Sequence, residues 1–164
     1  METTKSISTF QFFTKEQLLA HWQGHRALSR RVLEAFPEKE LFEFSIGGMR
    51  TYAQLAKEMI SMAAPTAKGL ATDTWEEHNE ELTELKTKED LLANWDDSTK
   101  IINEYWDQIP EDRFQQTVVA FGQYEDKGYC TLLYIIENEV HHRGQGFVYL
   151  RALGITPPNF WERD

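Results

Sequence analysis

Residues 131–158 constrain the fold of this chain more than any other stretch. They predict one long helix with apolar residues on nearly every face, ended by Gly154 and the Pro157–Pro158 pair. A helix of this kind belongs in a protein core. Several polar side chains nevertheless interrupt its middle: Asn138, His141, His142, Arg143 and Gln145. Because buried polar groups need partners, the helix predicts a polar site inside a helical domain.

Three further helices are predicted, each beginning at a threonine that can cap it and ending near a proline. They run from Thr14 to Pro37, over about residues 51–64 and over about residues 88–109. Thr51 and Thr87 are the second and third caps, and Pro65 and Pro110 are the expected stops. The segment before the first helix contains Phe10, Phe12 and Phe13 and is expected to form an arm that packs on the domain.

Two connections complete the predicted fold. Residues 67–86 are strongly acidic and predict a loop, with or without a short exposed helix after Thr74. This connection is too long for a tight turn between antiparallel helices and suggests a crossover. Residues 117–121 are β-branched and apolar and predict a small extended segment, without a full sheet. We therefore expect a single all-α domain over residues 1–164, a four-helix bundle with a long crossover connection.

Composition excludes several classes of function. The formal net charge of −10 argues against a nucleic-acid surface, and it also disfavours binding to an anionic membrane. No apolar run approaches the ~20 residues of a membrane span, and the N-terminus has no signal peptide, so a cytoplasmic protein is expected. The single cysteine, Cys130, excludes an internal disulfide and a cysteine-based zinc cluster, and is expected to be a small inert residue.

The polar residues of the long helix fall on one stripe. At 100° per residue, a sector of roughly 60° contains Thr131, Asn138, His142, Gln145 and Tyr149. Asn138 lies one turn before His142, a spacing that lets two side chains bind one ion. A metal would need a further ligand from another helix, and Glu58 is the best candidate. A hydrogen-bonded cluster without any ion is the alternative.

The other histidines are weaker candidates. His21 and His25 also have the i, i+4 spacing, but their neighbours, Arg26 among them, suggest that they face solvent. His78 lies in the acidic connection and is expected to be exposed.

The same residues resemble a known family. The run His141-His142-Arg143-Gly144-Gln145, followed by Tyr149-Leu150-Arg151, Gly154 and Pro157-Pro158, resembles the closing signature of the DinB/YfiT-like superfamily. Residues 49–56 resemble that family's second helix. The resemblance implies a four-helix bundle with a crossover, usually a homodimer. It also implies a divalent metal, commonly Ni or Zn, held by one histidine of the second helix and two of the last.

Only one of these three histidines is present. By the resemblance, His142 corresponds to the second histidine of the last helix, Asn138 to the first, and Glu58 to the histidine of the second helix. A Glu/Asn/His site would shift preference toward oxygen-loving ions such as Mn or Mg. Alternatively the site holds no metal, and Glu58 pairs with a protonated His142.

Two functions follow from the resemblance. The first is a metal-dependent thiol S-transferase or related hydrolase acting on a small molecule. In it Glu58, Asn138 and His142 hold the metal, which activates a low-molecular-weight thiol, and Gln145 and Tyr149 contact the ligand. The second is a non-catalytic small-molecule-binding or stress-response protein with a degenerate, metal-free site. A purely structural dimerisation module is a third possibility, and DNA binding ranks last because of the charge.

Overall fold

Threonine caps begin three of the long helices, as the sequence predicts. The computed structural model describes residues 13–163, and in it α1 (Lys15–Ala35), α3 (Tyr52–Thr72) and α4 (Lys88–Trp106) each start with a capping box. In a capping box the threonine side chain and the residue three positions on bond each other's backbone N–H groups. The last long helix, α5 (Gly128–Ala152), starts without a side-chain cap. Across residues 13–163, no helix combines the length with the apolarity that a membrane span requires.

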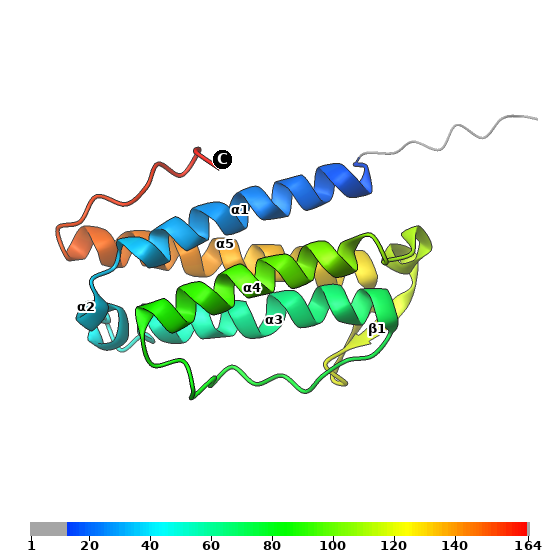
Figure 1. Cartoon of the computed structure of the whole chain (residues 1–164), viewed down its shortest axis with the longest axis horizontal. Helices are drawn as coiled ribbons and strands as arrows, with labels where there is room; N and C mark the ends of the chain where they lie inside the picture. Colours follow the sequence, from blue (N-terminus) through cyan, green and yellow to red (C-terminus); the bar gives the residue numbers. More distant parts are fainter. Residues whose placement is uncertain (1–12, 164) are drawn as a thin grey trace, which may run out of the picture.

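The connection between α3 and α4 is a crossover. Residues 73–87 run back along the length of α3, so α4 starts beside the start of α3 and the two helices point the same way (Figure 1). α1 and α5 point the opposite way. The Nζ of Lys15, at the start of α1, donates to the carbonyl of Ile109 just beyond α4, at 2.8 Å. The predicted all-α four-helix bundle with a crossover is confirmed.

The prediction that Pro65 ends the second long helix is wrong, because Pro65 lies inside α3. A proline in a helix removes one backbone hydrogen bond and usually bends or ends the helix. Here the turns beyond it are tied to the core by buried apolar residues, including Ala67 and Leu70, both 0 % exposed. The helix ends instead at Asp73, which adopts a left-handed conformation with φ of 59°. No helix follows Thr74 in the described connection.

Three small elements differ from the expectation. The short link after α1 contains a helix, α2 (Glu38–Glu43), and a 3₁₀ turn, η1 (Glu111–Gln115), follows α4. The predicted extended segment is β1 (Thr117–Ala120), which pairs antiparallel with a second strand, β2 (Tyr124–Lys127). The sequence reasoning missed β2, whose four residues are all exposed and lack an apolar alternation. Of the predicted N-terminal arm, only Phe13 lies within the described residues.

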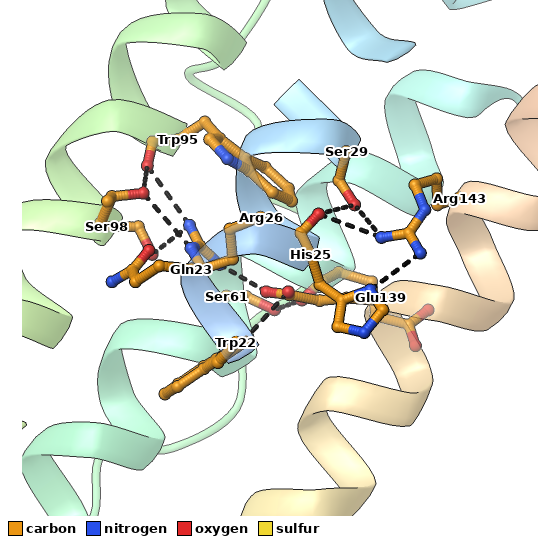
Figure 2. A network of polar contacts seen from close by, with 12 residues as sticks. Trp22, Gln23, His25, Arg26, Ser29, Ser61, Trp95, Ser98, Glu139 and Arg143 are labelled. Carbon is orange, nitrogen blue, oxygen red and sulfur yellow. Dashed lines mark hydrogen bonds and ion pairs between the residues drawn. The ribbon is translucent and has the colours of Figure 1, made fainter. Parts of the chain in front are cut away.

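A buried ion pair joins α1 to α5 in the middle of the bundle (Figure 2). Arg26 donates to Glu139, and their side chains are 1 % and 0 % exposed. Trp22 Nε1 donates to the other carboxylate oxygen of Glu139 at 3.2 Å. Arg26 also donates to the carbonyl of Trp95 and to Ser98 Oγ, at 3.3 and 3.2 Å. Both charges are therefore partnered, as buried charges must be.

A second arginine extends this network. Arg143 donates to the carbonyl and to Nδ1 of His25, both at 3.0 Å, and to Ser29 Oγ at 3.2 Å (Figure 2). Burial, with nearby Arg143 and Arg163, lowers the pKa of His25 to about 4, so the ring is neutral at pH 7. The prediction that His25 and Arg26 face solvent is wrong. Their helix face meets buried polar groups of α4 and α5 that the local sequence does not reveal.

Gly146 of α5 is required by close packing against Tyr52. A Cβ at this position would meet the Tyr52 ring, with Cζ only 2.8 Å away. The ring cannot retreat, because it is 0 % exposed and stacks on Phe36 with 4.6 Å between centroids.

Replacing Gly146 with Ala is expected to lower the free energy of unfolding by about 1 to 3 kcal/mol, the usual cost of overpacking. Gly144, two residues earlier in the same helix, is the matched control. A Cβ there meets nothing within 4 Å. Gly144→Ala is therefore expected to stabilise the protein by up to about 1 kcal/mol. Urea denaturation followed by circular dichroism measures both, and equal effects of the two substitutions would contradict the proposed contact.

Candidate functional site

Three side chains from α3 and α5 meet at one point. Asn138 Nδ2 donates to Glu58 Oε1 at 2.8 Å, and His142 Nε2 lies 3.0 Å from the same oxygen. Asn138 and His142 are one helical turn apart, so both point at α3. Glu58 lies on the facing side of α3 and is largely buried, with 12 % of its side chain exposed. The expected convergence of these three residues is what the geometry shows.

A fourth residue, Arg50, completes this polar cluster, and the sequence reasoning missed it. Arg50 Nη2 lies 2.5 Å from Glu58 Oε2, and its Nη1 lies 3.7 Å from Glu80 Oε2 in the crossover. Both oxygens of Glu58 are therefore occupied by donors. Hydrogen bonds from His142, then Asn138 and Arg50, lower the pKa of Glu58 to about 2 against the opposing effect of burial. Glu58 is an anion at any physiological pH.

The imidazole of His142 lies between two oxygen acceptors. Its Nδ1 is 2.8 Å from Gln145 Oε1, and its Nε2 is 3.0 Å from Glu58 Oε1. A proton on Nε2 is donated to Glu58, and a proton on Nδ1 is donated to Gln145. Gln145 is thus placed where the sequence predicts, but its amide oxygen contacts His142. The cluster thus places Arg50 and His142 against the two oxygens of the anion Glu58.

Tyr149 contacts the cluster through the backbone of Arg50. It is 0 % exposed, and its hydroxyl donates to the backbone carbonyl of Arg50 at 2.9 Å. Its ring also packs edge-on against Phe44, with 5.8 Å between centroids. Burial raises the pKa of Tyr149. Tyr149 therefore holds the backbone of Arg50, the residue that contacts Glu58. The sequence predicts that Tyr149 contacts a ligand, but in the structure its hydroxyl contacts Arg50.

A cleft of about 770 Å³ opens beside Glu58. Residues of α3, α5, the β1–β2 hairpin and the crossover line it, and Thr131 of the polar stripe is among them. Cys130, expected to be a small inert residue, is half-buried in the wall of this cleft. The volume of the cleft lies within the range of small-molecule sites, roughly 300 to 1,000 Å³.

His78 attaches the crossover to α3 at the wall of the cleft. Its Nε2 lies 3.0 Å from Ser61 Oγ, and its ring centroid is 5.4 Å from that of Phe121. Ser61 Oγ donates to the carbonyl of Glu58, which leaves the hydroxyl oxygen free to accept from His78. The prediction that His78 is exposed is wrong, because this pairing and the hairpin half-bury the ring.

The arrangement of donors does not suit the divalent metal that the resemblance implies. Within residues 13–163, no group of three or more His, Cys, Asp or Glu side chains could hold a metal ion. Asn138 Oδ1 is buried without a hydrogen-bond partner there, and it could complete a Glu/Asn/His set. However, the carboxylate of that set is already paired with the Arg50 guanidinium, whose charge opposes a second cation.

Comparison with known proteins identifies the family. The family model of DinB matches residues 3–164, nearly the whole chain. The chain belongs to the DinB family. The uncharacterized protein YjoA of Bacillus subtilis strain 168 is 24% identical over 151 residues, which cover 90% of this chain and 96% of YjoA.

Two crystal structures have a similar fold. A DinB-like protein from Bacillus cereus ATCC 10987 superposes with a TM-score of 0.73 at 17% identity, over 89% of this DinB-family chain and 97% of the other. A DinB-like protein from Bacillus subtilis, YjoA, superposes with a TM-score of 0.69 at 18% identity, over 90% and 99% of the two chains. At these identities the similarity concerns the fold alone.

Proposed function

We propose that this DinB-family protein binds a small organic molecule in the cleft beside Glu58, without a metal ion. The observation that carries the proposal is the ion pair between Arg50 and Glu58. A guanidinium neutralises the single carboxylate among the three side chains that correspond to the family's ligands. The protein therefore balances the charge of this site with its own side chains.

The cleft supplies what the polar cluster alone lacks. It places apolar walls, among them Met62 and Ile135, beside the fixed polar groups of Glu58 and its partners. Ligand sites in proteins combine a mostly apolar cavity with a few oriented polar groups in this way. Binding in such a cleft needs no open coordination position.

The competing proposal is the metal-dependent thiol S-transferase. One observation favours it: Asn138 Oδ1 is buried without a hydrogen-bond partner in the described structure. Such an oxygen is a suitable ligand for a hard cation such as Mn²⁺. The homodimer that the family resemblance implies is likewise a proposal.

Two measurements on the purified full-length protein test the metal-free proposal. Elemental analysis after purification without chelators is expected to find less than a tenth of one Ni, Zn or Mn per chain, and EDTA is expected to leave the melting temperature unchanged. A stoichiometric metal would overturn the proposal and favour the transferase.

The neutral dye Nile red tests the cleft itself, because its fluorescence rises in an apolar site. Gln123→Trp, in the exposed wall of the cleft, is expected to reduce the signal. Gln108→Trp, exposed and outside the lining, is the matched control. No signal with the unmodified protein, or equal loss in both variants, would count against binding in the cleft.

A further inference from the structure

We infer that the ligand of the cleft is an organic cation, a protonated amine carried on an apolar or aromatic body. This inference rests on the proposed function and adds the chemical class of the ligand. It stands on three features of the described cleft: the charges of its wall, the aromatic side chains beside them, and an inward-facing tyrosine that is left uncovered.

The charges of the wall have one sign. Among the described residues that line the cleft there are four carboxylates and no Lys or Arg. Glu58 and Glu80 share Arg50 as their ionic partner. Glu125 and Asp126 of β2 have no ion pair within residues 13–163. Asp126 pairs with the buried Val118 on the inner face of the hairpin, whereas Glu125 pairs with the exposed Val119 on the outer face. A wall of this kind repels anions and leaves the Asp126 carboxylate available to an incoming cation.

Aromatic side chains accompany these carboxylates on both sides. Tyr134 of α5 and Tyr124 of β2 line the cleft, and Phe121 does so from the hairpin turn. Organic cations are bound by carboxylates together with aromatic faces, since the face of a ring carries negative charge. An acidic patch alone would attract any cation, whereas the aromatic rings favour one with an organic body.

The hairpin register shows that this wall faces the bundle. Tyr124 is paired with Ala120, and Asp126 is paired with Val118. Directly paired residues share a face of an antiparallel sheet, and Val118 and Ala120 are each only 2 % exposed. Tyr124 nevertheless remains 61 % exposed. A large aromatic side chain on the inner face of a hairpin is therefore uncovered because the cleft lies over it.

The turn of the hairpin places Phe121 in an unusual backbone conformation. Phe121 has φ of 54°, a left-handed conformation that a bulky residue rarely adopts. Its ring packs against Trp75 and His78, with centroids 5.7 and 5.4 Å apart. Residues in such conformations are frequent at binding sites, and here the two ring contacts hold Phe121 in the wall of the cleft.

Three matched probes test the charge preference by isothermal titration calorimetry in the presence of EDTA. They are tryptamine, which is cationic, tryptophol, which is neutral, and indole-3-acetate, which is anionic. Tryptamine is expected to bind about tenfold more tightly than tryptophol, and indole-3-acetate more weakly than either. Equal affinities for tryptamine and tryptophol would overturn the cation inference and leave the proposed function standing. No binding of any probe, with no Nile red signal, would overturn both.

Three variants locate the binding, and one of them, Glu137→Gln, is a control. Asp126→Asn is expected to lower the affinity for tryptamine about three- to tenfold and to leave the affinity for tryptophol unchanged. Glu137→Gln removes the same charge from an exposed position on α5 outside the cleft, and it is expected to change neither. Equal losses in both variants would assign the preference to the net charge of the chain and overturn the inference. Tyr134→Leu, which keeps an apolar side chain, is expected to lower the affinity for tryptamine more than the affinity for tryptophol. The opposite order would also overturn the inference.

Discussion

Replacing Glu139 with Met is expected to lower the free energy of unfolding by about 3 to 5 kcal/mol. The substitution leaves Arg26 charged, buried and without its carboxylate, and removal of one member of a buried ion pair has this cost. It also removes the acceptor of Trp22 Nε1. Urea denaturation, followed by circular dichroism and by tryptophan fluorescence, measures the change.

A double variant and a surface control test whether the loss comes from the unpaired charge. The double variant Arg26→Met with Glu139→Met is expected to cost less than Glu139→Met alone, because no unpaired charge stays in the core. Asp96→Asn is the surface control. Asp96 accepts from Arg30 at 2.6 Å, but 42 % of its side chain is exposed, so a loss of at most about 1 kcal/mol is expected. A loss for Glu139→Met as small as that for Asp96→Asn would contradict the assigned role.

Restoring the missing imidazoles is expected to create a metal site. In the triple variant Arg50→Gln, Glu58→His and Asn138→His, three histidines would project from the positions that now meet at one carboxylate oxygen. Three imidazoles with an open position are a common zinc site. Zn²⁺ at a hundred times its Kd is then expected to add about 2.7 kcal/mol of stability, seen as a rise in Tm.

The unmodified protein and a fourth variant are the controls. The unmodified protein is expected to show no change with Zn²⁺, because Arg50 is paired with Glu58. Adding His142→Gln to the triple variant removes one ligand and is expected to abolish the rise in Tm. If the triple variant binds no zinc, the three positions do not converge as described. If the unmodified protein responds equally, the metal-free proposal fails.

Local sequence signals predicted much of this fold. The capping boxes at Thr14, Thr51 and Thr87 place three helix starts, since each depends only on residues three positions apart. The stripe on α5, with Glu58 on the facing helix, also follows from helical spacing. These features were predictable because the side chains concerned are close in sequence or lie on opposed helix faces.

The remaining features depend on contacts between distant segments. Arg50 precedes the cap of α3, and its position beside Glu58 is set by the turn there and by the Tyr149 hydroxyl. Pro65 stays within a helix because the rest of α3 is buried. One missed feature had a signal: Glu139 and Arg143 are charged and one turn apart on a helix with apolar residues on nearly every face, which indicates core partners.

The return of the chain along α3 affects how the protein folds as it leaves the ribosome. α3 and α4 pack side by side, but they point the same way and are joined by the long connection of residues 73–87. They therefore cannot form first as a simple helical hairpin, which needs antiparallel helices and a short turn. α3 obtains this neighbour only after residue 106 has been synthesised. Closing the intervening loop carries an entropic cost that must be met before the packing between the two helices is gained.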